Sequence, residues 1–343
     1  MIDIRVHTPD AASIDEAADR LRSGDVVVVP TETVYGLAAS TSDASAISRI
    51  FTLKSRPADN PLIAHVLDEA QACSVVSGWD DRCRALAENF WPGPLTMILP
   101  RRPVVPAIAA GGRDTLAVRS PAHPVARAVL TALGTPFSAP SANRSNMISP
   151  TRASHVVDDY RTMQEADGLL VLDGGECEFG IESTVLDLTT SDPTILRPGS
   201  IPSTEIESLL GSVARVQPNT QIHAPGTASR HYAPRTPMHL LHRDEILGII
   251  QSQDEHLGVI VFGSDLPSSR VHSIHRLPDS PDSYAERLYS TLRSLDGMGL
   301  DRILVEHPPD TTGWDAVRDR LQRGSTHVST TRSAGGGSSG GSS

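Results

Sequence analysis

The chain has 343 residues and a formal net charge of −11, and this acidic balance argues against a broad basic surface for nucleic acid. No run of about eighteen apolar residues occurs and the N-terminus lacks the basic and apolar segments of a signal peptide, so neither a membrane span nor secretion is expected. The length exceeds that of one typical core and predicts two domains. Three widely spaced cysteines, Cys73, Cys83 and Cys177, suggest a reducing cytosol and no disulfide framework or zinc site.

A run of polar residues follows a short predicted strand near the N-terminus. Apolar residues at helical spacing predict a helix over residues 11–22, and Val26–Val29 then has the composition of a buried strand, which Pro30 ends. The residues that follow, Thr31-Glu32-Thr33-Val34-Tyr35, bring hydroxyls and a carboxylate to the mouth of that strand. Open α/β sheets usually bind ligands there. The alternative is that Thr31 or Thr33 only caps the next turn.

A rigid basic loop follows a helix expected over residues 44–53. Lys54 and Arg56 could simply complement the helix dipole, but Pro57 and Pro61 fix the loop and hold Lys54, Arg56 and Asn60 in place. A fixed lysine and a planar arginine fork are suited to phosphate. His65 lies in the next expected strand, 62–66, where a histidine is more often part of the core.

Several later segments also place polar groups beside strands. Residues 115–119 alternate so that Thr115, Ala117 and Arg119 share one face, and Arg119 suggests a carboxylate or phosphate partner. The small residues of 137–145 allow a ligand close to the backbone, although a plain Ser/Ala turn is the alternative. A helix expected to start at Ser149-Pro150-Thr151 could receive phosphate at its N-terminus.

Six ordered motifs carry a family resemblance. They are Thr-Glu-Thr-Val-Tyr-Gly-Leu, Lys-x-Arg-Pro, Asn-Pro-Leu-x-x-His, Ser-Ala-Pro-Ser-Ala-Asn, Glu-Ser-Thr-Val and Leu-Arg-Pro-Gly. In this order the chain resembles the YrdC family of threonylcarbamoyl-AMP synthases over about residues 10–205. One departure is Ser145-Asn146 where the family usually has Ser-Gly; Asn tolerates a left-handed conformation, so the turn is expected to survive.

The resemblance implies roles for individual residues. Threonine is expected at Thr33, His65, Arg119, Ala139 and Ser183, with Arg119 on its carboxylate. ATP is expected at Arg56, Asn60, Thr115, Ser141, Ser149, Arg197 and Tyr232. Lys54 and Arg56 are the expected catalytic residues, with Lys54 on phosphate or the carbonate. Mg²⁺ would arrive with ATP, and Glu32 is the candidate protein ligand for it.

The resemblance also implies a domain plan. We expect an α/β fold in which residues 1–210 form a YrdC-like catalytic domain, a twisted sheet with helices and a concave site. Residues 211–236 resemble the linker of the long, two-domain form of the family, which folds back over the active site. Residues 237–326 alternate strands and helices and predict a smaller Rossmann-like α/β domain with a parallel sheet. Residues 327–343 are a Gly/Ser-rich tail.

The implied reaction joins L-threonine, bicarbonate and ATP into threonylcarbamoyl-AMP and pyrophosphate, which makes the enzyme a nucleotidyltransferase. Its product serves the threonylcarbamoyladenosine modification of tRNA next to the anticodon, through hand-over to a tRNA threonylcarbamoyl transferase complex in the cytoplasm. No Ser-His-Asp or Cys-His pairing is evident, so a covalent enzyme intermediate is not expected. An RNA-binding module of the same fold and a carbamoyl-adenylating transferase are the alternatives.

Overall fold

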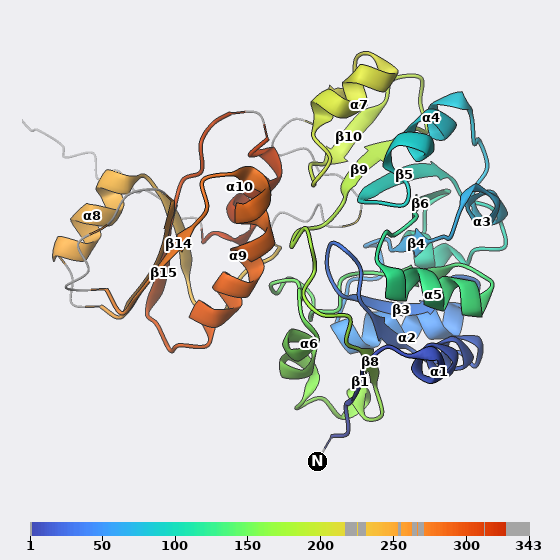
Figure 1. Ribbon diagram of the computed structural model, residues 1–343, viewed down its shortest axis with the longest axis horizontal. Coiled ribbons are helices and arrows are strands. Elements are labelled where there is room, and N and C mark those ends of the chain that lie inside the picture. The colour runs from blue at the N-terminus through green and yellow to red at the C-terminus, as the bar shows by residue number, and fades with distance from the viewer. Residues whose placement is uncertain are drawn as a thin grey trace, which may run out of the picture.

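The computed structural model describes residues 2–216, 225, 231–252, 255–262, 266, 271–311 and 313–326. Figure 1 shows two bodies side by side, a larger one formed by the N-terminal part of the chain and a smaller one formed by the C-terminal part. Residues 217–224 and 226–230 of the segment expected to fold back over the site, and all of the Gly/Ser-rich tail 327–343, lie outside the described residues. No described helix combines the length and apolar character needed to cross a membrane.

The larger body is organised by a mixed, twisted sheet of 11 strands among the described residues, in the order β1-β8-β2-β3-β7-β4-β6-β5-β9-β10-β11. The strands are β1 Arg5–His7, β2 Val27–Val29, β3 Gly36–Ser40, β4 Ile63–His65, β5 Leu95–Pro100, β6 Thr115–Arg119, β7 Phe137–Ala139, β8 Leu170–Leu172, β9 Thr184–Asp187, β10 Thr194–Arg197 and β11 Ala214–Arg215. Because β11 pairs with β10, the sheet continues into the segment expected to be linker.

The helices of this body are α1 Ala11–Arg22, α2 Ala44–Lys54, α3 Glu69–Val75, α4 Asp81–Phe90, α5 Pro124–Leu133, α6 Ala153–Tyr160 and α7 Ser203–Leu210, with 3₁₀ turns at Ala107–Ala110 and Gln164–Ala166. Aspartate side chains begin several of them: Asp10 accepts a hydrogen bond from the Ser13 backbone, and Asp80 does so from Cys83. Such caps satisfy backbone donors that a helix cannot pair internally. The expected helix at Ser149 begins only at Ala153, so its N-terminus is not at the serine.

Helices on both faces explain the continuous valine run of β2. Val28 belongs to the core cluster on one face, whereas Val27 and Val29 belong to the cluster on the other face. A strand covered on both sides needs apolar side chains at every position. The polar run that follows, Thr31–Tyr35, therefore marks the point where the chain leaves the buried part of the sheet.

The hairpin from β2 to β3 brings this polar run against a neighbouring strand. Gly36 pairs with Val29, and the hairpin returns antiparallel to β2. A Cβ on Gly36 would lie 3.1 Å from the Cβ of Ala139 and 3.6 Å from the Pro140 carbonyl oxygen, so a side chain here would push away the loop after β7. Glycine at this position lets that loop close one side of the site.

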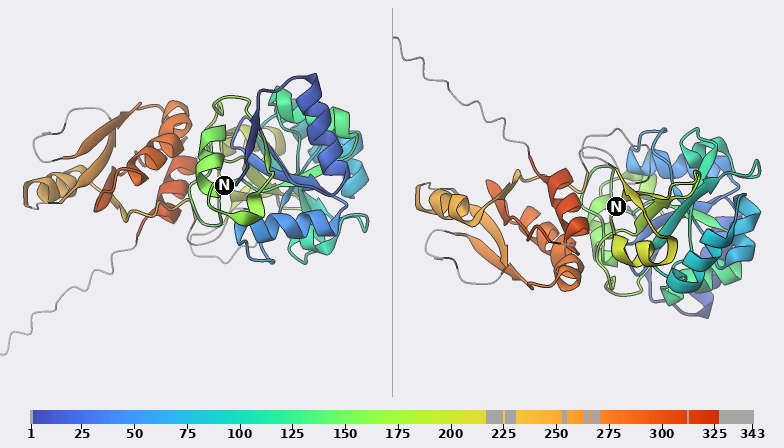
Figure 2. Two further views of the ribbon diagram at one scale, coloured as in Figure 1. Left: turned by 90° about the horizontal axis from the view of Figure 1, so that it is seen from below. Right: turned by 90° about the horizontal axis from the view of Figure 1, so that it is seen from above.

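The described residues of the smaller body form a parallel four-stranded sheet, in the order β12-β15-β13-β14, with β12 Met238–Leu241, β13 Leu257–Phe262, β14 Ser273–Leu277 and β15 Arg302–Glu306. Its helices are α8 Arg243–Ser252, α9 Pro281–Asp296 and α10 Asp315–Gly324. The expected parallel α/β domain is confirmed. Figures 1 and 2 show α9 and α10 on the side that faces the larger body and α8 on the far side.

Candidate active site

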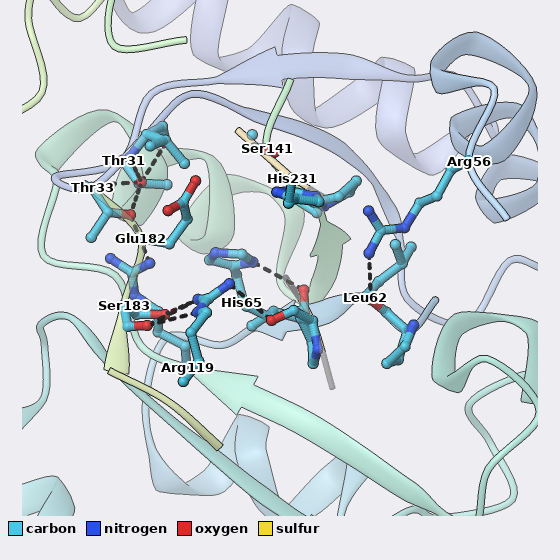
Figure 3. A pocket seen from close by; sticks show the side chains of 18 of the residues that line it. Thr31, Thr33, Arg56, Leu62, His65, Arg119, Ser141, Glu182, Ser183 and His231 are labelled. Atoms are coloured by element: carbon cyan, nitrogen blue, oxygen red, sulfur yellow. Dashed lines mark hydrogen bonds between the residues drawn. The ribbon is translucent and has the colours of Figure 1, made fainter. Parts of the chain in front are cut away.

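A pocket opens where the ends of β2, β4, β6 and β7 meet, and Figure 3 shows its lining side chains. Pairing places His65 beside Arg119 on one neighbouring strand and beside Phe137 on the other, which brings segments distant in sequence to one spot. The lining residues are Thr31, Thr33, Val34, Gly36, Arg56, Pro61, Leu62, Ile63, His65, Arg119, Ala139, Pro140, Ser141, Glu182, Ser183, Arg197, Pro225, His231 and Tyr232.

Most of the expected site residues come together here. All five residues expected at threonine line the pocket, namely Thr33, His65, Arg119, Ala139 and Ser183. Arg56, Ser141, Arg197 and Tyr232, from the set expected at ATP, line it too. These nine residues come from seven separate segments of the chain. Their convergence supports a single composite site with two neighbouring halves.

Arg119, at the end of β6, is held in place by three neighbours. Its Nη2 donates to Glu32 Oε1 at 2.6 Å, its Nη1 donates to Thr33 Oγ1 at 2.9 Å, and its Nε donates to the Gly93 carbonyl at 3.1 Å. Burial alone would raise the pKa of Glu32, but the Arg119 guanidinium overcomes this and holds that pKa below its ordinary value. The result is a charged, preorganised arginine on the pocket wall.

The two threonines of the polar run have different tasks. Thr31 Oγ1 accepts from the backbone N–H of Val34 at 3.2 Å and donates to the Val34 carbonyl at 2.6 Å, so it holds the turn. Thr33 Oγ1 lies 3.0 Å from Thr31 Oγ1 and accepts from Arg119. The capping interpretation therefore describes Thr31, although Thr31 also lines the pocket, and the ligand interpretation fits Thr33.

His65 is a neutral group on the pocket wall. Burial, with a smaller effect of the Arg119 charge, lowers the pKa of His65 to about 3. Its Nδ1 lies 3.1 Å from the Ile63 carbonyl oxygen, and because a carbonyl only accepts, Nδ1 must carry the proton. The ring is stacked on Phe137 with centroids 5.2 Å apart. Nε2 is consequently an acceptor, suited to an ammonium or hydroxyl of a ligand.

Arg56 and Arg197 supply the other cationic groups among the lining residues. Arg56 Nη2 donates to Asn60 Oδ1 at 2.6 Å and to the Pro61 carbonyl at 2.8 Å, and burial lowers its pKa to about 10, so it stays protonated at neutral pH. Arg197 donates through Nη2 to the Ser183 carbonyl at 2.9 Å and through Nη1 to the Pro225 carbonyl at 2.9 Å. Both forks are fixed before any ligand arrives.

Five expected site residues do not line the pocket. Lys54 is buried behind it, where its ammonium donates to the carbonyls of Ser141, at 2.5 Å, and Asn143. Burial lowers the pKa of Lys54 well below its ordinary value. Asn60 orients Arg56 instead, and Thr115 lies at the opposite end of β6 from Arg119.

The remaining two of these five residues are committed to side chains of the site. Ser149 Oγ donates to Glu182 Oε1 at 2.5 Å. Glu32 accepts from Arg119 Nη2 at Oε1 and from the backbone N–H of His123, at 3.4 Å, at Oε2. A carboxylate engaged in this way does not fit the role of a magnesium ligand. No group of three or more His, Cys, Asp and Glu among the described residues is arranged to hold a metal ion.

The structure adds residues that sequence reasoning did not assign. Glu182 lines the pocket, and its motif was recognised only for the following serine. His231, next to Tyr232, is buried against the Tyr232 ring, with centroids 4.1 Å apart, and its Nδ1 has no hydrogen-bond partner among the described residues. The available signal for Glu182 was an acidic residue inside the Glu-Ser-Thr-Val motif. His231 adjoins an expected ligand residue, which was the available signal for it.

The site and fold define a long-form YrdC-like enzyme, and comparisons with known proteins agree. A family model described as "Telomere recombination" (Sua5_yciO_yrdC) matches residues 19–199, and one described as "Threonylcarbamoyl-AMP synthase, C-terminal domain" matches residues 201–326. The chain is 39% identical to the threonylcarbamoyl-AMP synthase of Pyrococcus abyssi over 324 residues, covering 90% of this chain and 93% of that protein. It is 36% identical to that of Bacillus subtilis, covering 90% and 92%.

A solved structure extends the likeness to three dimensions. The crystal structure of P. abyssi Sua5 complexed with L-threonine matches with a TM-score of 0.85 at 36% sequence identity, over 95% of this chain and 97% of that one. The chain therefore belongs to the Sua5/YrdC family, in its two-domain form.

Proposed function

We propose that this chain is an L-threonylcarbamoyladenylate synthase, a nucleotidyltransferase that makes threonylcarbamoyl-AMP and pyrophosphate from L-threonine, bicarbonate and ATP. The observation that carries the proposal is the pocket itself, which the guanidinium forks of Arg56, Arg119 and Arg197 line together with hydroxyl groups and the neutral His65. Threonine, bicarbonate and ATP all carry negative charge, so cationic positioning is the main catalytic task. The names of its full-length relatives support the same activity.

The threonine half is the part around Arg119. Its guanidinium pairs with the substrate carboxylate, Thr33 and Ser183 offer hydroxyls, and Ala139 leaves room for the side chain. The Nε2 acceptor of His65 orients the ammonium or hydroxyl of threonine. The P. abyssi Sua5 structure, solved in complex with L-threonine, supports threonine as a substrate of this chain.

The ATP half is the part around Arg56, Arg197, Ser141 and Tyr232. The two arginines screen the phosphates, and the tyrosine ring offers a surface for the base or ribose. Magnesium is proposed to come with ATP as the counter-ion of its phosphates. Glu32 is engaged with Arg119, so we assign no protein carboxylate to the ion.

The chemistry follows in two balanced steps. The amine of threonine attacks the carbon of bicarbonate, and loss of water leaves a carbamate. A carbamate oxygen then attacks the α-phosphorus of ATP, and pyrophosphate leaves. The protein contributes orientation and charge screening at both steps, with no covalent enzyme intermediate. We expect the product to pass to a tRNA threonylcarbamoyl transferase in the cytoplasm.

The test is the release of pyrophosphate from ATP, with threonine and bicarbonate each present or left out. We expect an AMP-linked product and pyrophosphate only when both are present. Release of ADP and phosphate would contradict adenylation. Affinity for RNA that is unaffected by the three small substrates, without any turnover, would favour the RNA-binding alternative.

A further inference from the structure

The carboxylate of Glu182 is the one acidic side chain among the described lining residues of the pocket, and it must be neutralised there. Ser149 donates to Oε1, and the Tyr289 hydroxyl donates to Oε2 at 3.0 Å. Both donors are neutral. A bare carboxylate in a pocket for anionic substrates would repel them by a few kcal/mol at distances of several ångströms, using an effective dielectric constant of about 20.

The compensating cation comes from the smaller body. Arg320, on α10, is fully buried and donates through Nε to Glu182 Oε2 at 2.8 Å and through Nη2 to the Glu182 carbonyl at 3.3 Å. Its Nη1 donates to the Pro198 carbonyl at 3.0 Å, which ties the same arginine to the loop after β10. Burial raises the pKa of a carboxyl, yet the charges of Arg320 and Arg197 lower the pKa of Glu182 to about 2.

The same arginine also supports the tyrosine on the pocket wall. The guanidinium carbon of Arg320 lies 5.1 Å from the centroid of the Tyr232 ring, and that ring is stacked on Tyr289 at 5.8 Å. Gly324, at the end of α10, lets the backbone of Tyr232 approach: a Cβ there would lie 3.0 Å from the Tyr232 carbonyl oxygen. Helix α10 thus contacts two lining residues from outside the catalytic domain.

We propose that Arg320 is a positioning residue for the nucleotide half of the site. It neutralises Glu182 and fixes this carboxylate at the pocket wall, so that the second body completes the electrostatics of the first. This inference rests on the proposed function. It assigns to the C-terminal domain a specific effect on ATP affinity, because Arg320 contacts Glu182 and Tyr232. The Arg119 side chain, by contrast, is held by Glu32, Thr33 and Gly93 of the larger body.

The test compares Arg320→Gln with Arg293→Gln as a matched control. Arg293 is also a largely buried arginine of the smaller body at the domain boundary, but it pairs with Asp159, at 2.7 Å, and with the carbonyls of Ile148 and Ser149. We expect Arg320→Gln to weaken binding of a non-hydrolysable ATP analogue by about tenfold to a hundredfold, measured by calorimetry. Threonine affinity and the Arg293→Gln variant should change by less than about threefold. Equal losses in both arginine variants would reduce Arg320 to a docking residue and overturn the proposal.

A second comparison uses Glu182→Gln as background, which has no carboxylate to neutralise. In that background, Arg320→Gln should weaken ATP-analogue binding by less than about threefold. The difference from its effect in the unmodified protein would show that the two positions are coupled. The same loss in both backgrounds would overturn the proposal. If the single variant Arg320→Gln does not fold, the double variant is compared with Glu182→Gln alone, and a loss of about tenfold or more in that comparison would also overturn the proposal. Failure of the proposed function would look different, because the unmodified protein would then bind neither ATP nor threonine.

Discussion

Arg119 and Glu32 form a buried ion pair, with Nη2 2.6 Å from Oε1 and both side chains only 3% exposed. A buried charge without a partner is costly, so each group depends on the other for its ionised state. Thr33 and Gly93 accept hydrogen bonds from the other guanidinium nitrogens, Nη1 and Nε, and fix the orientation of the group. Glu32 thereby acts on a ligand only through the arginine.

The first prediction separates binding from stability at this pair. Arg119→Ala should raise the KM for threonine by about tenfold to a hundredfold or more, because a charged hydrogen bond to the carboxylate is lost. It should also lower the free energy of unfolding by about 3–5 kcal/mol, because Glu32 is left buried and unpaired. The double variant Glu32→Gln/Arg119→Ala should regain much of this stability and none of the threonine affinity. Kinetics measures the KM for threonine, and urea denaturation measures the free energy of unfolding. If the double variant regained threonine affinity, the assignment of Arg119 to the threonine carboxylate would be wrong.

A second prediction concerns Lys54. Its ammonium holds two carbonyls of the loop that carries Ser141, so its effect on ATP should be indirect. Lys54→Met leaves both carbonyls unpaired and should cost about 1–3 kcal/mol of stability together with ATP affinity. Lys54→Gln can still donate and should retain part of both, although it has no charge. If the glutamine variant lost ATP binding as fully as the methionine variant while remaining stable, a direct phosphate contact would be the better interpretation.

Local signals made much of the fold predictable from the sequence. Helix α1 has the expected bounds because the Asp10 side chain caps its first turn and Ser23-Gly24 end it. Asn146 has φ +68°, as expected for an asparagine in place of glycine. The short strands β3 and β7 were missed because they consist largely of Gly, Ala and Ser, whose pairing is decided by distant neighbours.

The direction of long side chains was beyond sequence reasoning. Lys54 ends helix α2 within a family motif, but whether its ammonium enters the pocket depends on a loop 87 residues further along the chain. The contact of Glu182 with Arg320 spans 138 residues and two domains. Resemblance identified the segments that meet, and only the packing shows which side chains face a ligand and which support their neighbours.

The third prediction is a pH dependence of stability that stems from Glu182. Because its folded-state pKa of about 2 lies below the ordinary value of 4.5, its contribution is complete above about pH 5 and is lost as the pH falls toward 2. Between pH 6 and pH 3.5 this amounts to about 1 kcal/mol. Urea denaturation at both pH values should show a smaller loss for Glu182→Gln than for the unmodified protein. The exposed Glu178→Gln is the control, and equal slopes in all three proteins would contradict the paired, ionised state of Glu182.

The last prediction concerns Tyr232, which is buried at the pocket wall with φ +59°. Its ring is stacked on Tyr289, so it could serve the nucleotide or merely dock the second body. We expect Tyr232→Ala to weaken ATP binding by about tenfold to a hundredfold, as stacking of a base on an aromatic ring contributes about 1–3 kcal/mol.

Product formation should fall with it, because the ring also excludes water from an easily hydrolysed intermediate. Threonine binding should persist, since the Arg119 side chain is held by Glu32, Thr33 and Gly93. Tyr232→Phe keeps the ring and is the matched control, expected to retain most of the ATP affinity. Calorimetry with each ligand and thermal denaturation separate contact with the nucleotide from docking of the second body. If Tyr232 only docks the second body, Tyr232→Ala will have lower stability and unchanged affinity for ATP.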